Sequence, residues 1–253
     1  GSYEMNDKLV KTVVVSGGSG KMGNLITDYL ESRDDFKVVG IFDPSYTEGE
    51  YSKVNNLENV DSDIVIEFSP ASEINDNLEK LLKTNSTLII GSSGIEEKLV
   101  ANLRSLENRS IFVIPNFSVG AALQKITSNI IAQSFQKVEI VEKHHSGKQD
   151  APSGTAIDLA LSLPDTIKSS GIEGDFYSKN DINDKIIMSL RDDKYMAEQE
   201  VLFSNEFEHL NSEHIVNDRR AYLFGVKLVL DNVDNFKGFV YGLETILNRN
   251  ISI

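Results

Sequence analysis

The chain has 253 residues, which suffices for one large domain or two modest ones, and its composition of 40% hydrophobic and 25% charged residues is ordinary for a globular protein with a sizeable core. With 39 Asp and Glu against 25 Lys and Arg, its formal net charge is −14, which disfavours nucleic acid as a partner because such a surface repels phosphates. The lack of cysteine excludes disulfides, thiolate catalysis and zinc–thiolate sites, and no apolar run is long enough to cross a membrane. We therefore expect a cytoplasmic enzyme with no signal peptide, no metal and no membrane partner.

In the first half of the chain, short apolar runs alternate with stretches of helical periodicity. Such alternation is typical of βαβ units, whose parallel strands form a sheet that helices cover on both faces. This half is therefore expected to have an α/β fold. The expected strands are 12–15, 36–42, 64–68, 88–90 and 111–114, and the expected helices are 25–30, 74–82 and 96–106.

The second half changes character after a helix expected over 119–135. Strand-like stretches dominate it, and one helix that begins near Ser153 interrupts them, so we expect an α+β domain with a mixed or antiparallel sheet. Ser, Gly, Asp and Asn make 164–184 a long loop, and 236–247 reads as a helix. The expected strands are 138–143, 185–190, 199–207 and 221–230.

A glycine-rich stretch at 17–23 follows the first strand and carries the G-x-G-x-x-G pattern of dinucleotide-binding folds. Its glycines permit a tight turn and a close approach of the backbone to a pyrophosphate. Asp43 follows the second strand, where a carboxylate accepts hydrogen bonds from the adenosine ribose of NAD and repels the phosphate of NADP. We expect NADH as the preferred cofactor, with NADPH possible because Lys21 can reach that phosphate.

Two further loops, 91–94 and 115–118, follow strands of the same expected sheet. Ligands bind at the carboxyl ends of such strands, and the small residues of these loops leave room for a nicotinamide and its ribose. On the residues alone, both loops are equally compatible with ordinary turns.

The segment 144–155 combines two histidines, a lysine and a Pro-Ser-Gly-Thr helix start within a strand-to-helix loop. Imidazole carries protons near neutral pH, so His144 or His145 is a candidate acid, and Lys148 supplies a positive charge or a second proton. Backbone N–H groups of residues 153–155 at a helix start favour a carboxylate or phosphate. The alternative is a solvated surface loop.

These motifs resemble those of the dihydrodipicolinate reductase family over nearly the whole chain. The family signature His-His-x-x-Lys-x-Asp-Ala-Pro-Ser-Gly-Thr matches 144–155 at every fixed position. The family's Asp-Phe-Thr strand end is similar to Glu67-Phe68-Ser69, and its His-x-x-x-x-Arg matches His214 and Arg219. The other matches are the loops 17–23, 91–94 and 116–118.

The resemblance implies a Rossmann-type dinucleotide-binding domain over 1–115 and 220–253, and a substrate-binding and oligomerisation domain over 116–219. It implies a homotetramer that reduces 4-hydroxy-tetrahydrodipicolinate, a small dicarboxylate, to tetrahydrodipicolinate with NAD(P)H, in diaminopimelate and lysine biosynthesis.

The resemblance also implies the site residues. His144 becomes the general acid/base and Lys148 the proton donor. The substrate-binding residues are His145, Lys148, Ser153, Gly154 and Thr155. The cofactor-binding residues are Gly17, Gly18, Ser19, Gly20, Lys21, Met22, Asp43, Phe68, Gly91, Ser92, Ser93, Pro115, Asn116 and Phe117.

The segment 189–201 departs from the family pattern, because Asp193, Ala197 and Gln199 replace two glycines and a histidine. Since residues other than glycine adopt positive φ poorly, we expect the local turn and the tetramer packing to differ from those of the family. Two other functions stay open: a nicotinamide dehydrogenase for another keto or amino acid, and a nucleotide-sensing protein that has lost its chemistry.

Overall fold

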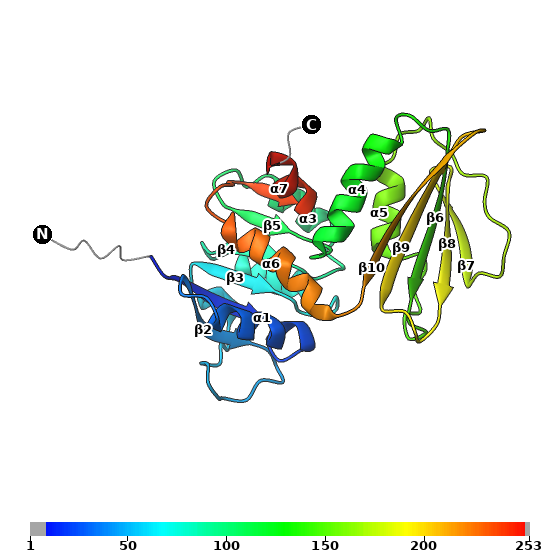
Figure 1. Ribbon diagram of the computed structural model, residues 1–253. Helices are drawn as coiled ribbons and strands as arrows, with labels where there is room; N and C mark the ends of the chain where they lie inside the picture. The colour runs from blue at the N-terminus through cyan, green and yellow to red at the C-terminus, as the bar shows by residue number, and fades with distance from the viewer. Residues whose placement is uncertain (1–8, 251–253) are drawn as a thin grey trace, which may run out of the picture. The chain divides into compact units, whose positions relative to one another are not determined.

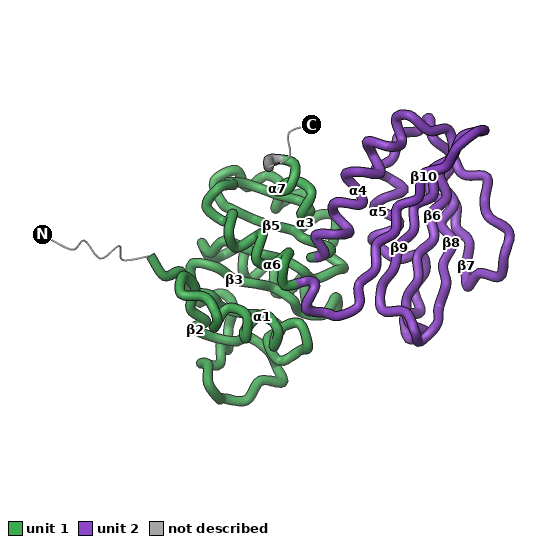
Figure 2. Tube along the Cα trace, viewed as in Figure 1, with its two compact units in different colours: residues 1–117, 223–249 green, residues 118–222, 250–253 purple. Residues whose placement is uncertain are grey.

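The computed structural model describes residues 9–250. The chain forms two units, and the first is discontinuous: it comprises the residues up to Phe117 together with Leu223–Arg249. The second unit, Ser118–Tyr222, is inserted between these two parts (Figure 2). Each unit has its own sheet.

The first unit contains a six-stranded parallel sheet of order β11-β5-β4-β3-β1-β2 (Figure 1). Val13, Val14 and Val15 are all buried, so helices cover this sheet on both faces, as the α/β prediction requires. The strands are β1 (Lys11–Ser16), β2 (Phe36–Phe42), β3 (Ile64–Glu67), β4 (Thr87–Ile90), β5 (Ile111–Val113) and β11 (Phe239–Tyr241). The helices are α1 (Lys21–Glu31), α2 (Ile74–Leu81), α3 (Glu97–Arg104), α6 (Tyr222–Asp231) and α7 (Leu243–Asn250), with a 3₁₀ turn η1 at Leu57–Asn59.

The second unit contains a five-stranded sheet of order β10-β9-β6-β8-β7. Only β6 and β8 pair in parallel, which makes this the mixed sheet that the sequence predicts. Its apolar face packs on two helices, through side chains such as Ile140, Phe203 and Leu159. The strands are β6 (Lys137–His144), β7 (Ser178–Ile182), β8 (Lys185–Arg191), β9 (Ala197–Ser204) and β10 (His209–Val216). The helices are α4 (Val119–Ile131) and α5 (Gly154–Ser162), with a 3₁₀ turn η2 at Arg219–Ala221.

The strand expected over 221–230 is wrong, because this stretch forms the helix α6. Its buried residues are Gly225, Val226, Val229 and Leu230, a spacing that follows the helical period. The run is apolar on nearly every position, and a short continuous apolar run does not distinguish a strand from a helix.

Three other expectations also need correction. The sequence analysis missed β10, a strand at the edge of the sheet with many polar residues that pairs with β9 along its whole length. The expected loop 164–184 contains β7, another edge strand, whose Ser, Lys, Asn and Asp residues have low strand propensity. The expected helix 236–247 begins instead with β11, and Gly242, at φ +78°, separates this strand from α7.

Candidate functional site

The glycine-rich loop forms a tight turn between β1 and α1. Gly17 has a φ of +83°, and a Cβ there would lie 2.8 Å from the carbonyl carbon of Phe68. A Cβ at Gly23 would lie 2.5 Å from the oxygen of Gly17. Gly20 caps α1, and no side chain caps this helix start. The loop therefore depends on glycine at two places and presents the amino end of a helix, as a pyrophosphate site needs.

Asp43 lies directly after β2 and contacts the glycine-rich loop. One carboxylate oxygen accepts hydrogen bonds from the amide (3.1 Å) and hydroxyl (2.5 Å) of Ser19, and the other accepts one from the amide of Ser45 (2.9 Å). Burial opposes ionisation of this group, but these hydrogen bonds outweigh burial and lower the pKa of Asp43. The carboxylate is therefore ionised at the edge of the loop.

The loops after β3, β4 and β5 meet at the same edge of the sheet. The rings of Phe68 and Phe117 lie 5.4 Å apart, and a Cβ at Gly91 would approach the Phe68 ring to 2.5 Å. The amide of Phe68 bonds to the oxygen of Ser16, and the amide of Gly91 to that of Glu67. The first unit thus brings the predicted cofactor residues of its five loops together. Of the remaining members of these loops, Ser92 is buried, Asn116 half-buried, and Ser93 and Pro115 are exposed.

Glu67, at the end of β3, is a fully buried acid beneath this edge. Its carboxyl group accepts a 2.7 Å hydrogen bond from the amide of Ser69. Burial is the largest influence on this group and raises the pKa of Glu67, although the hydrogen bond from Ser69 and the nearby polar side chains of Ser16 and Asn77 act in the opposite direction. No Lys, Arg or His within residues 9–250 forms an ion pair with it.

In the second unit, β6 leads directly into the histidine and lysine loop. His144 is the last residue of this strand and is half-buried, whereas His145 is exposed. Lys148 folds back, so that its amide bonds to the oxygen of His145 and its ammonium lies 3.0 Å from Asp150. The pKa of Asp150 is lowered chiefly by this hydrogen bond from Lys148. The loop therefore presents an imidazole and an ammonium within five residues.

Ser153 caps α5 at the end of this loop. Its hydroxyl oxygen accepts a 3.2 Å hydrogen bond from the amide of Ala156, a common arrangement at helix starts. Its own amide, which the sequence analysis expected to be available to an anion, instead donates to Glu142 at 3.3 Å. Gly154 is exposed, with no atom within 4 Å of a Cβ placed there, and Thr155 is half-buried.

The sequence analysis missed Glu142 and Arg191. Glu142 is fully buried, and its carboxylate accepts hydrogen bonds from His144 and from two nitrogens of Arg191. A usable signal exists in the period-two pattern of β6, because Glu142 occupies the same face as Val138 and Ile140, which lie in the core. A charged residue in such a position needs a buried partner.

The altered segment 189–201 forms a turn without strain. Among the described residues, only Asn183 and Asp184 have positive φ apart from glycines. The turn between β8 and β9 is closed by hydrogen bonds, including one from the hydroxyl of Ser146 to Asp193. The replaced glycines are therefore not required for this turn.

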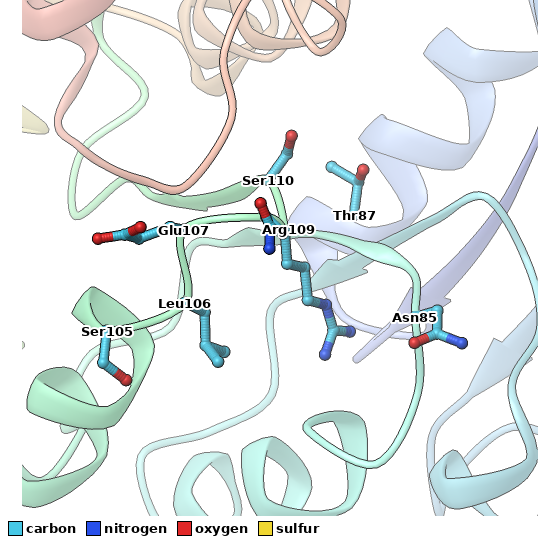
Figure 3. A pocket seen from close by; sticks show the side chains of 8 residues that line it. Asn85, Thr87, Ser105, Leu106, Glu107, Arg109 and Ser110 are labelled. Atoms are coloured by element: carbon cyan, nitrogen blue, oxygen red, sulfur yellow. The ribbon is translucent and has the colours of Figure 1, made fainter.

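A cavity of about 590 Å³ lies at the opposite end of the first unit's sheet, before β4 and β5 (Figure 3). Arg109 lines it and donates hydrogen bonds to the backbone oxygens of Leu81 and Ser86. A third hydrogen bond from its guanidinium reaches the hydroxyl of Thr84. These bonds hold the connection between α2 and β4, which is a structural role.

Comparison with known proteins identifies the same two parts of the chain. Sequence models described as dihydrodipicolinate reductase, N-terminus and C-terminus, match residues 11–117 and 118–247. A 4-hydroxy-tetrahydrodipicolinate reductase of Dictyoglomus turgidum is 31% identical over 95% of this chain and 99% of its own. A 4-hydroxy-tetrahydrodipicolinate reductase of Legionella pneumophila (strain Philadelphia 1) is 34% identical over 93% of this chain and 98% of its own.

Solved structures agree on the fold. A dihydrodipicolinate reductase from Paenisporosarcina sp. TG-14, solved with dipicolinate bound, aligns with a TM-score of 0.78 at 24% identity over 94% of this chain and 99% of its own. A myo-inositol dehydrogenase from Lactobacillus casei aligns with a TM-score of 0.66 at 14% identity over 94% and 90%. The expected fold class is confirmed. Within residues 9–250, no helix is both long and apolar enough to span a bilayer.

Proposed function

The chain belongs to the dihydrodipicolinate reductase family, and we propose that NADH delivers the hydride of its reaction while His144 and Lys148 handle the proton. The family's reaction is the reduction of 4-hydroxy-tetrahydrodipicolinate by a nicotinamide dinucleotide, in lysine and diaminopimelate biosynthesis. One observation supports these roles above the others: the half-buried imidazole of His144 lies beside an ionised carboxylate on the loop that also carries Lys148.

The cofactor site that we propose is the edge formed by the first unit's five loops. The glycine-rich loop would bind the pyrophosphate at the start of α1, and the loops at 91–93 and 115–117 would surround the nicotinamide with Phe68. The ionised Asp43 favours NADH, because its carboxylate would accept from ribose hydroxyls and repel a ribose phosphate. To accept from the ribose hydroxyls, the carboxylate of Asp43 must either keep its hydrogen bonds from Ser19 beside the new ones or give them up.

The substrate site that we propose is the loop 144–155. The solved relative carries dipicolinate, a planar dianion, and the substrate of the family is a related dicarboxylate. His145, Lys148, Gly154 and Thr155 would bind its carboxylates, with Ser153 contributing its hydroxyl because its amide is already engaged. Lys148 would exchange Asp150 for a substrate carboxylate of the same charge.

The proton would come from this same loop. The Nδ1 atom of His144 faces Glu142, so Nε2 is the nitrogen left to exchange a proton with the substrate. Lys148 would supply the proton that follows the hydride. A nicotinamide dinucleotide, when bound, supplies the hydride itself, and the chain contributes position, charge and protons.

We propose that the first unit is the dinucleotide-binding domain and that the second is the substrate-binding and oligomerisation domain of a cytoplasmic homotetramer. Both helices within Ser118–Tyr222 contribute to one core against one face of the sheet. The opposite face of the sheet carries half-buried apolar residues such as Ile186 and Leu202, and this face would pair with a second copy.

The direct test follows nicotinamide absorbance with 4-hydroxy-tetrahydrodipicolinate made freshly from pyruvate and aspartate semialdehyde by the preceding synthase. We expect oxidation that depends on the substrate, faster with NADH than with NADPH. Asp43→Ala should weaken NADH binding and narrow that difference, and an unchanged preference would show that Asp43 does not select the cofactor. Turnover of simple keto or imino acids alone would support another dehydrogenase, and NADH binding without turnover would support a sensor.

The role of His144 has its own test. His144→Ala should lower kcat by about 10²- to 10⁴-fold and leave NADH binding nearly unchanged, because general acid catalysis contributes that much. His209→Ala is a matched control, since His209 is exposed on β10 outside the loop. A kcat near that of the wild type in His144→Ala would remove His144 from the mechanism.

A further inference from the structure

We infer that Glu142 is a positioning residue for the reaction: it fixes the hydrogen of His144 on Nδ1 and, through Arg191, holds the loop that carries Lys148. The inference rests on the proposed function, because it assigns how the acid/base His144 is oriented. It concerns two residues that contact neither substrate nor cofactor in the proposed scheme.

The carboxylate of Glu142 is the centre of four hydrogen bonds. One oxygen lies 2.5 Å from Nδ1 of His144 and accepts from Nη1 of Arg191 at 3.0 Å. The other accepts from Nη2 of Arg191 at 2.9 Å and from the amide of Ser153 at 3.3 Å. A single buried group thus contacts the end of β6, the start of α5 and the end of β8.

Arg191 extends this arrangement to the loop itself. Its Nε donates to the backbone oxygen of Lys148 at 2.9 Å, and Nη2 donates to that of Asp150 at 2.8 Å. Its guanidinium also lies 5.3 Å from the centre of the Tyr177 ring, and the hydroxyl of Tyr177 bonds to the backbone oxygen of Gln149. Three consecutive carbonyls of the loop, 148–150, are therefore fixed by Arg191 and the tyrosine beneath it. The side chain of Arg191 is 4% exposed, so this contact is not shared with solvent.

The ionisation of Glu142 decides what it does to the imidazole. Burial disfavours its charge, but the hydrogen bonds from His144 and Arg191 prevail and lower the pKa of Glu142 to about 2. An ionised carboxylate can only accept hydrogen bonds, so Nδ1 must carry a hydrogen. Nε2 is then the nitrogen available to the substrate, and Arg191 balances the buried negative charge.

The test compares two variants that both lack a buried guanidinium. Arg191→Met keeps the carboxylate of Glu142 beside His144, whereas Arg191→Met combined with Glu142→Leu removes both members of the ion pair together. In Arg191→Met the carboxylate keeps His144 and the amide of Ser153 as hydrogen-bond partners, and circular dichroism establishes that both variants are folded before they are compared. Nitrogen-15 NMR of histidine-labelled protein reports whether Nδ1 carries hydrogen. The chain has four histidines, and the signal lost in His144→Gln identifies His144.

We expect Nδ1 of His144 to keep its hydrogen in Arg191→Met and to lose it in the double variant. In addition, kcat should be at least about 10-fold lower in the double variant than in Arg191→Met, within the 10²- to 10⁴-fold that general acid catalysis supplies. Arg191→Met alone should mainly raise the KM for the dicarboxylate, because the loop of Lys148 is released. Glu139→Gln, on the same strand and bonded to the amides of Ser170 and Gly171, is the control.

Equal Nδ1 signals and equal kcat in the two variants would overturn the inference and reduce Glu142 to a counter-ion of Arg191. The NMR measurement is made without cofactor or substrate, so it does not depend on turnover. A wild type that shows the Nδ1 hydrogen but no turnover would overturn the proposed function and leave the Glu142–His144 pair standing.

Discussion

Glu67 and Glu142 each lie fully buried at the carboxyl end of a strand, one in each unit, yet their pKa values move in opposite directions. In the first unit, burial raises the pKa of Glu67, and the hydrogen bond from the amide of Ser69 and the polar side chains nearby do not overcome it. In the second unit, burial acts the same way on Glu142, but Arg191 and His144 overcome it. The partners of a fully buried glutamate therefore decide its charge: the surroundings of Glu67 favour the neutral form, and those of Glu142 favour the ionised form.

This difference corresponds to the tasks of the two regions. The edge of the first unit presents backbone amides and aromatic rings that need close packing and no buried charge. The loop of the second unit presents an imidazole whose orientation needs a fixed, ionised acceptor. The surroundings thus favour the neutral form of a buried carboxyl group in the first unit and the charged form in the second.

The largest expected effect comes from Glu142→Gln, which leaves Arg191 buried without a counter-ion. We expect the free energy of unfolding at neutral pH to fall by about 3–5 kcal/mol, as when one member of a buried ion pair is removed. Urea denaturation measures it, with Glu139→Gln as the control expected to change stability by less than about 1 kcal/mol. A loss as small as that of the control would mean that the pair is not desolvated in solution.

Acid should remove the contribution of Glu142 in the wild type. The pKa of Glu142 is about 2 in the folded protein, below the ordinary 4.5. Its ionisation therefore stabilises the fold fully above about pH 4.5, and this stabilisation is lost as the pH falls through about 2. The difference between the two pKa values corresponds to about 3 kcal/mol of stability. The stability gap between wild type and Glu142→Gln should therefore narrow between about pH 5 and pH 2. A gap that stays constant over this range would contradict an ionised Glu142.

On the other side of the comparison, the glycine-rich loop should be sensitive to a single methyl group. Gly17→Ala combines a positive φ with a contact of 2.8 Å to the backbone of Phe68, so we expect a loss of about 1–3 kcal/mol in stability and weaker NADH binding. Gly20→Ala is the matched variant, because its Cβ would meet only the Gly17 oxygen at 3.6 Å. It should weaken NADH binding while its stability stays near that of the wild type. Equal thermal midpoints for the two variants would argue against the strained turn.

The smallest effect is expected from Glu67→Gln. Because the pKa of Glu67 is raised, its contribution to stability is complete below the ordinary value of 4.5 and is lost as pH rises. Glutamine cannot ionise. The free energy of unfolding of the variant should therefore equal that of the wild type or exceed it by about 1 kcal/mol at neutral pH, and the two should be equal near pH 4. Denaturation at both pH values measures this, and a loss of several kcal/mol at neutral pH would show that Glu67 is ionised.

Sequence reasoning reached the two units unequally for a physical reason. The first unit follows local rules: strand, glycines, helix and acid occur in order, and Gly17, Asp43 and Phe68 lie within three consecutive loops. The support of His144 depends on Arg191, which is far along the chain and reaches Glu142 only through the parallel pairing of β6 and β8. Register of this kind is a tertiary property, which a local pattern does not contain. The edge strands β7 and β10 were not predicted for the same reason, because pairing with β8 and β9 stabilises them more than their own strand propensity does.

The discontinuous first unit also has a consequence for synthesis on the ribosome. β5 pairs on one side with β4, but its other neighbour, β11, begins only at Phe239. Until the inserted unit, Ser118–Tyr222, and the helix that follows it have been made, β5 remains the unpaired margin of a nascent sheet. A chain that stops after Tyr222 would keep that margin open, and its backbone groups would be exposed to other nascent chains.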